Sequence, residues 1–184
     1  MINNEFIIIE DFLSKEECNF ILNKCKEELT LSTARVANGN ENERKSSVAW
    51  INDLGFVNEK LKNVLKINYQ FAGIEVTGLG PFQFTEYKVG GYFAWHKDRD
   101  SSTYTYRNRF ASTVIQLNDD YSGGILEIKD TKGDLIPMNH RMGNLYIFNS
   151  NLYHRVTPVE DGIRYTLVNW VSTVKNDETK QNII

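Results

Sequence analysis

The stretch Gly91-Tyr-Phe-Ala-Trp-His-Lys97 is one of eight short runs rich in β-forming residues that occupy the chain from residue 74 onward. The expected strands cover residues 75–88, 91–97, 109–118, 124–130, 134–138, 143–149, 153–159 and 163–173. Gly, Asn and Asp separate the runs, as is typical of turns between strands. Eight short strands joined by turns predict a double-sheet jelly roll, also called a double-stranded β-helix, whose mouth is a usual ligand site.

Two helices are expected ahead of these strands. Ser14 and Glu17 form a capping-box pattern, which predicts a helix from about residue 15 to 29. Apolar residues at helical spacing predict a second helix near residues 54–70. The polar stretch at 32–47 has no periodicity and is expected to be a loop. The predicted fold class is therefore mainly β with flanking helices (α+β), the helices being packed on the outer face of one sheet.

The length of 184 residues and the apolar content of 41% fit a single compact domain. We expect this domain to span residues 1–184, with a helical N-terminal part at 1–73 that supports a jelly-roll core at 74–174. The polar tail after Val174 is expected to be frayed.

The charge and the cysteines restrict the class of protein. A formal net charge of −3 provides no bulk positive field for nucleic acid or an anionic membrane. The N-terminus does not have the pattern of a signal peptide, and no stretch approaches the roughly 20 apolar residues of a membrane span. Cys18 and Cys25 share the first expected helix about 10 Å apart, too far to form a disulfide with each other. These features favour a soluble protein of the reducing cytoplasm.

Three residues have the chemistry and spacing of metal ligands. His96 and Asp98 are two residues apart, which on an extended backbone places both side chains on one face. His154, in a later expected strand, is the candidate for a third ligand. Two histidines and one carboxylate form the facial triad that binds non-haem Fe(II) and leaves positions open. Taken alone, however, the His-x-Asp pair is better explained as a histidine hydrogen-bonded to a loop aspartate.

The position of Arg164 favours a functional site over a structural hydrogen bond between His96 and Asp98. It follows His154 by ten residues, and a tight turn at 159–162 would make the last two strands antiparallel, with both side chains facing one cavity. A guanidinium in that cavity is a bidentate partner for a dicarboxylate. The alternative, a surface salt bridge, is disfavoured because Arg164 lies within a run of β-forming residues.

Several segments between residues 74 and 173 share their order and spacing with a known family. They are Gln83–Tyr87, Gly90–Phe93, His96, Asp98, Ser112–Asn118, Ser122–Leu126, Gly143–Phe148, His154–Val159 and Arg164–Trp170. As a set, they resemble the catalytic domain of the prolyl hydroxylase superfamily of Fe(II)- and 2-oxoglutarate-dependent dioxygenases. The arginine at 164, where collagen-type relatives carry lysine, makes the chain more similar to the oxygen-sensing and bacterial branches.

The resemblance implies roles for individual residues. His96, Asp98 and His154 would be the iron ligands, and Arg164 would bind the distal carboxylate of 2-oxoglutarate. Tyr87 would hydrogen-bond the co-substrate, with core packing as its alternative, and Gln116 stands where some relatives have another such tyrosine. Leu126, Val156 and Trp170 would line the site, although aromatic and aliphatic residues are expected there in any β core.

The resemblance also implies an activity. It predicts an enzyme that uses Fe(II), 2-oxoglutarate as co-substrate, O2 and ascorbate as reductant to hydroxylate a C–H bond, most simply on a prolyl residue of a peptide or protein, with release of succinate and CO2. A hydroxylase of a free amino acid or other small metabolite is one alternative, and a non-catalytic jelly-roll binding module is another. The loop Arg99–Asn108, which contains two tyrosines, is expected to be either a substrate lid or a plain connection.

Overall fold

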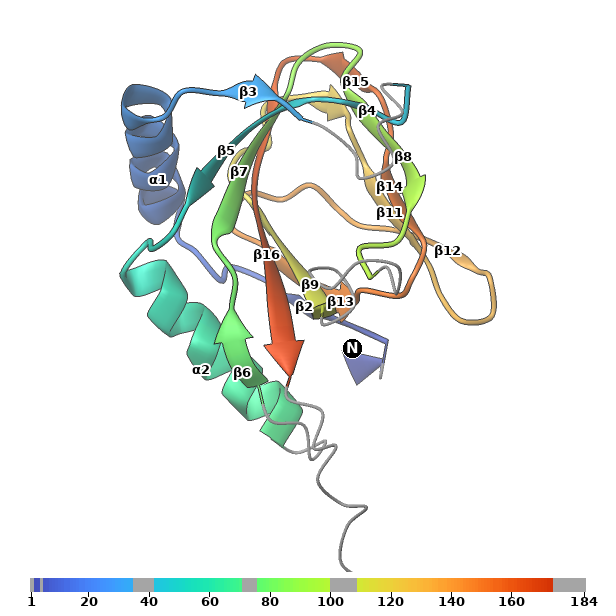
Figure 1. Cartoon of the computed structure of the whole chain (residues 1–184). Coiled ribbons are helices and arrows are strands. Elements are labelled where there is room, and N and C mark those ends of the chain that lie inside the picture. The colour runs from blue at the N-terminus through green and yellow to red at the C-terminus, as the bar shows by residue number, and fades with distance from the viewer. Residues whose placement is uncertain (1, 4, 35–41, 71–75, 100–108, 174–184) are drawn as a thin grey trace, which may run out of the picture.

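The computed structural model describes residues 2–3, 5–34, 42–70, 76–99 and 109–173. In these residues two main β-sheets face each other, and two helices lie against the outside of the larger sheet (Figure 1). The expected frayed tail lies outside the described residues, as does the expected lid apart from Arg99. No helix in the described part of the chain is long and apolar enough to span a membrane.

The larger sheet has nine strands in the order β1-β2-β13-β9-β16-β7-β5-β3, and β6 pairs with β16. The strands are β1 (Ile2–Asn3), β2 (Phe6–Ile9), β3 (Ser32–Thr33), β5 (Ser47–Ile51), β6 (Val76–Leu79), β7 (Phe82–Tyr87), β9 (Arg109–Gln116), β13 (Leu145–Asn149) and β16 (Arg164–Thr173). Strands from both ends of the chain, β2 and β16, flank the central pair of β13 and β9. This sheet therefore ties the beginning of the chain to its end.

The smaller main sheet has five strands in the order β12-β11-β14-β8-β4. They are β4 (Arg44–Lys45), β8 (Tyr92–His96), β11 (Leu126–Lys129), β12 (Leu135–Pro137) and β14 (His154–Val156). A separate ribbon pairs β10 (Ser122–Gly123) with β15 (Val159–Asp161). All strand pairs in both main sheets are antiparallel, so side chains directly opposite each other share one face.

The strand predictions need correction in two respects. The prediction of a loop at 32–47 is wrong in part, because β3 and β4 lie there and β5 begins at Ser47. Both short strands pair at a sheet edge, where two polar residues can complete a ladder without an apolar repeat. The expected strands at 75–88 and 153–159 are each divided in two, with Pro81 and Pro158 in the breaks, because proline has no N–H to donate to a ladder.

Both expected helices are confirmed to within two residues at each end. Helix α1 (Lys15–Glu28) begins after Ser14, whose hydroxyl accepts the Glu17 N–H while the Glu17 carboxylate accepts the Ser14 N–H. Helix α2 is Phe56–Gln70. Cys18 and Cys25 are buried free thiols on α1, and burial raises the pKa of each to about 12. Both thiols therefore stay protonated at neutral pH and act as packing groups.

The larger sheet separates two apolar layers. Its outer face, with Phe84, Ile115 and Leu167, packs against the helices in one core cluster. Its inner face, with Val114 and Phe148 among others, packs in a second cluster against residues of the smaller sheet. Side chains that alternate onto the inner face of β16, β9 and β7 therefore point between the two main sheets, where the candidate site lies.

Gly143 is a position where the fold requires glycine. Its φ is +87°, and a Cβ at this position would overlap the Leu13 carbonyl oxygen.

We expect Gly143→Ala to lower the free energy of unfolding by more than about 2 kcal/mol, measured by urea denaturation. Gly133→Ala is the matched control, because Gly133 has a φ of +90° with no atom within 4 Å of its Cβ position. Equal losses for the two variants would show that the contact with Leu13 contributes nothing.

Candidate metal centre and adjoining cation site

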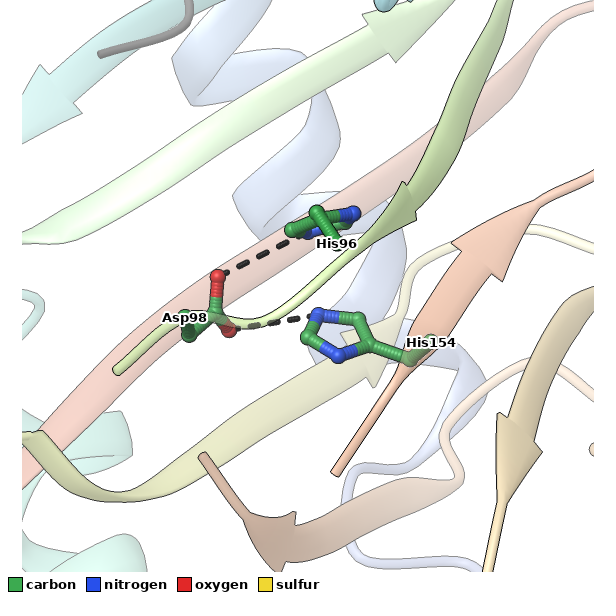
Figure 2. A group of neighbouring side chains, drawn as sticks. All are labelled: His96, Asp98 and His154. Atoms are coloured by element: carbon green, nitrogen blue, oxygen red, sulfur yellow. Dashed lines mark ion pairs between the residues drawn. The ribbon is translucent and has the colours of Figure 1, made fainter. Parts of the chain in front are cut away.

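Three potential metal ligands converge between the sheets. His96 ends β8, Asp98 follows two residues later, and His154 begins β14, directly opposite His96 in the pairing of these strands. One ligand atom of each side chain lies within 4.8 Å of the others. Figure 2 shows the Asp98 carboxylate facing both imidazole rings. Within the described residues this is the one group of three or more such side chains close enough to share an ion.

Backbone hydrogen bonds fix the orientation of both histidines. Nδ1 of His96 lies 2.8 Å from the Ala94 carbonyl oxygen, and Nδ1 of His154 lies 3.0 Å from that of Leu152. A carbonyl oxygen can only accept, so the geometry assigns the ring proton to Nδ1. Nε2 then presents a lone pair toward Asp98, at 3.6 Å from Oδ1 for His96 and 3.4 Å from Oδ2 for His154. The rings are held in the tautomer that a metal requires.

The charges of the group also suit a cation. Burial lowers the pKa of His96, and the neighbouring His154 lowers it further. Burial by itself would raise the pKa of Asp98, but the two neighbouring imidazoles, that of His154 foremost, outweigh it and hold that pKa well below its usual range. An ionised carboxylate beside an imidazole that resists protonation is the state in which ligand lone pairs are available to a metal.

Aromatic side chains enclose the histidines. Phe93 stacks on His96 with ring centroids 3.5 Å apart, and Phe148 meets His154 edge-on at 4.7 Å. The side chain of His154 is 6% exposed and that of His96 is 16% exposed. The His96 side of the cluster is thus the more open to solvent.

Arg164 is buried on the inner face of β16 without a carboxylate partner among the described residues. It lies opposite Tyr87, and its guanidinium carbon is 5.3 Å from the centre of the Tyr87 ring. Its Nε and the hydroxyl groups of Thr166 and Tyr121 are buried and have no hydrogen-bond partner in the described part of the chain. The expected alternative of a surface salt bridge therefore does not describe Arg164.

The surroundings of Arg164 fit a small anion. Burial raises the pKa of Tyr121, and the charge of Arg164 opposes that rise. Gly124 has a φ of +57°, and a Cβ at this position would lie 3.1 Å from Arg164 Cδ and 3.2 Å from a Tyr121 ring carbon. A buried polar group without a partner costs about 1–3 kcal/mol, and a carboxylate that accepted from these groups would remove that cost.

A small apolar cluster connects the surroundings of Arg164 with the candidate metal ligands. Tyr87, Val156 and Val159 form its buried core, and Phe93, which stacks on His96, packs against it. Val156 is also paired with Leu126 across the β14–β11 ladder. Tyr87, Val156 and Leu126, all expected to line the site, thus lie in or beside the region between Arg164 and the histidines.

The two remaining expected site residues have different surroundings. Gln116 is buried, and its Nε2 donates a hydrogen bond to the Asn118 carbonyl at 3.0 Å. The amide group of Gln116 therefore already has a backbone partner. Trp170 contacts Trp50, with ring centroids 5.9 Å apart, and the Arg109 guanidinium lies 3.7 Å from the Trp170 ring centre. Trp170 is paired with Ser112, which bonds to Asp98, so Trp170 lies on the strand next to the residue that holds this ligand.

Sequence reasoning missed four polar residues of this region. Thr166 could have been found, because it follows Arg164 by two residues on a strand and so shares its face. Tyr121, Ser112 and Ser150 reach the site through tertiary contacts that no local pattern indicates.

Comparison with known proteins agrees with this geometry. Residues 82–172 match the sequence profile of the 2OG-Fe(II) oxygenase superfamily, which confirms the resemblance to prolyl-hydroxylase-like oxygenases. The chain is 31% identical over 108 residues to a PKHD-type hydroxylase of Shewanella sp. (strain ANA-3), covering 56% of this chain and 48% of the relative. A PKHD-type hydroxylase of Methylobacillus flagellatus is 26% identical over 110 residues, with the same coverage. The chain thus spans about half the length of these curated relatives.

Solved structures share the fold at low sequence identity. A Pseudomonas putida prolyl-4-hydroxylase superposes with a TM-score of 0.74 at 21% identity, covering 93% of this chain and 94% of that one. A Trichoplax adhaerens prolyl hydroxylase, solved in complex with a hypoxia inducible factor peptide fragment, superposes with a TM-score of 0.81 at 18% identity, covering 98% and 89%. The likeness in fold therefore extends beyond residues 82–172 to most of the chain.

The ligand cluster generates a direct prediction for metal binding. We expect the protein to bind one Mn(II), used as a probe, and His154→Ala and Asp98→Ala to weaken binding by more than about 100-fold, because each removes a ligand. Isothermal titration measures the affinities. His140→Ala is the control, because His140 does not belong to the cluster. Equal Mn(II) binding by all four proteins would exclude a metal centre at this position.

Proposed function

Since residues 82–172 belong to the 2OG-Fe(II) oxygenase superfamily, we propose that the protein is an Fe(II)- and 2-oxoglutarate-dependent dioxygenase that hydroxylates a prolyl residue of a peptide or protein and releases succinate and CO2. The observation that carries this proposal is the His96, Asp98 and His154 cluster beside the buried, unpartnered donor of Arg164. We further propose that the chain is a single domain, in which the N-terminal helices support a jelly-roll core. Ascorbate would serve as the reductant of the enzyme.

His96, Asp98 and His154 would hold Fe(II). Three protein ligands on one side of the ion leave the other positions for the co-substrate and O2. Bound Fe(II) and 2-oxoglutarate would supply the oxidising power for C–H hydroxylation, with CO2 and succinate as co-products. The protein's own contribution is geometric: the Ala94 and Leu152 carbonyls orient the two imidazoles before any metal arrives.

Arg164 would bind the distal carboxylate of 2-oxoglutarate, and the Thr166 and Tyr121 hydroxyls would add hydrogen bonds. These groups are buried and lack other partners in the described residues, so binding an anion would restore hydrogen bonds that the apoprotein does not make. Tyr87 would pack against the guanidinium and define the width of the site. Because the Gln116 amide bonds to the backbone, we assign it the role of supporting β9 and not of contacting the co-substrate.

Apolar side chains would keep water from the reacting groups. Phe93 and Phe148 cover the two imidazoles, Val156 packs with Tyr87 and Phe93, and Leu126 is paired with Val156. A dry site directs the oxidant to the substrate and away from solvent.

A peptide substrate is supported by the rim of the site and by a structural neighbour. Trp50 is 49% exposed and contacts Trp170, which is paired with the strand that bonds to Asp98. The exposed indole of Trp50 suits a pyrrolidine ring and adjacent peptide groups. A prolyl hydroxylase with the same architecture has been solved with a bound peptide.

The alternative function, a binding module without catalytic activity, is disfavoured. Such a module has no need of three converging metal ligands next to a buried arginine whose Nε has no partner in the described residues.

The role of Arg164 can be tested by its removal. We expect Arg164→Ala to weaken 2-oxoglutarate binding by at least about 30-fold, because losing one partner of a buried charge pair costs roughly 2–5 kcal/mol. Binding is measured by titration with 2-oxoglutarate in the presence of Mn(II), and Mn(II) affinity itself should change little. Arg155→Ala is the matched control, since Arg155 bonds to Glu127 at 2.5 Å and does not belong to this site. Unchanged affinity in Arg164→Ala would exclude the proposed role.

The substrate class requires a separate experiment. We expect incubation with Fe(II), ascorbate, 2-oxoglutarate and a library of proline-containing peptides to add one oxygen to proline, located by mass-spectrometric fragmentation. Trp50→Ala should raise the KM for the peptide by about tenfold, because it removes an aromatic contact, and leave peptide-independent succinate formation unchanged. Phe20→Ala, an exposed aromatic on α1, is the control. Oxidation of a free amino acid or other metabolite, with no peptide oxidised, would replace the peptide with a small-molecule substrate.

A further inference from the structure

The Asp98 carboxylate is held by a serine from the opposite sheet. Ser112, on β9 of the larger sheet, donates its hydroxyl proton to Asp98 Oδ2 at 2.6 Å. Asp98 follows β8 of the smaller sheet, so this hydrogen bond crosses the space between the two sheets. Ser112 is fully buried, and in the described residues its hydroxyl is the one side-chain donor that hydrogen-bonds to this carboxylate.

A second serine fixes the direction of this hydrogen bond. The hydroxyl oxygens of Ser112 and Ser150 are 2.8 Å apart, and Ser150 is also fully buried. An ionised carboxylate can only accept, so the single Ser112 proton points to Asp98, and the Ser150 proton must then point to Ser112. The result is a directed chain from Ser150 through Ser112 to Asp98, in which each bond polarises and strengthens the next.

The turn that contains Ser150 holds Asp98 from the backbone as well. The Ser150 carbonyl accepts the N–H groups of Asp98 at 3.0 Å and of Arg99 at 2.9 Å. Two residues later in the same turn, the Leu152 carbonyl lies 3.0 Å from Nδ1 of His154. One short segment between β13 and β14 thus orients two of the three candidate metal ligands.

We propose that Ser112 and Ser150 are positioning residues, which hold Asp98 Oδ2 so that the carboxylate keeps a fixed rotamer and presents Oδ1 to the metal. This inference rests on the proposed function, because it assumes that Asp98 is a ligand. Neither serine belongs to the cluster of candidate ligands. Their contribution is to remove the rotational freedom of Asp98 before the ion binds, which raises metal affinity.

The test compares metal affinity in variants that differ by one hydroxyl. We expect Ser112→Ala to weaken Mn(II) binding by about 10–100-fold, the range found when an outer partner of a metal ligand is lost. Ser150→Ala should have a smaller effect, because its carbonyl still holds the Asp98 N–H. Ser112→Thr retains the hydroxyl and should bind within about threefold of the wild type. With Co(II) as a second probe, the absorption spectrum of Ser112→Ala should differ from that of the wild type, because the carboxylate is no longer fixed.

Thr113→Val is the matched control for stability. Thr113 is the next residue on β9, is fully buried, and donates its hydroxyl to the Asn169 carbonyl at 3.2 Å on the other face of the sheet. Its loss should lower the melting temperature about as much as Ser112→Ala does, while Mn(II) affinity stays at the wild-type value. Wild-type affinity and an unchanged Co(II) spectrum in Ser112→Ala would overturn the positioning role alone. Absence of Mn(II) binding by the wild-type protein would instead overturn the proposed function on which it rests.

Discussion

The pairing of β8 with β14 is the constraint on which the site depends. It places His96 and His154, 58 residues apart in sequence, directly opposite each other on one face of the smaller sheet. Because side chains alternate along a strand, a shift of one residue in this register would turn one imidazole to the outer face and leave no shared ligand sphere. The register is irregular between His154 and Val156, and this bulge brings Val156 opposite Phe93, the ring that stacks on His96.

The two sheets contribute different parts of the chemistry. The smaller sheet supplies His96 and His154, with Asp98 two residues after the end of β8, whereas the larger sheet supplies Arg164 and Thr166 from β16 and Ser112 from β9. The distance between metal and anion positions is therefore set by how the sheets pack. That packing depends on the apolar cluster that includes Phe148 and Ile128, and on the hydrogen bond between Ser112 and Asp98. Substitutions in this inner core should thus affect the site even where they touch none of its polar groups.

The parts of the fold and site that could be predicted are those with a local signal. Ser14 and Glu17 mark the start of α1 through capping chemistry, and the His96-x-Asp98 spacing places two ligand types on one face. The short strands β3 and β4 could not be predicted, because their pairing partners are distant and their polar residues have no repeat. Tyr121 and Ser150 belong to the same category: each lies in a connection between strands, and only the folded chain brings it to Arg164 or to Asp98. The family resemblance predicted the candidate metal ligands and Arg164, but not the residues that hydrogen-bond to Asp98 or lie beside Arg164.

The unpartnered polar groups around Arg164 would couple the stability of the folded protein to binding of the proposed dicarboxylate. Each such group costs the folded apoprotein about 1–3 kcal/mol, which is a large fraction of the 5–15 kcal/mol that separates a typical domain from its unfolded state. A ligand that binds only the folded chain stabilises it by about 2.7 kcal/mol at a concentration 100 times its Kd. Binding of the proposed dicarboxylate would therefore raise the folded fraction and slow proteolysis, which acts on the unfolded chain.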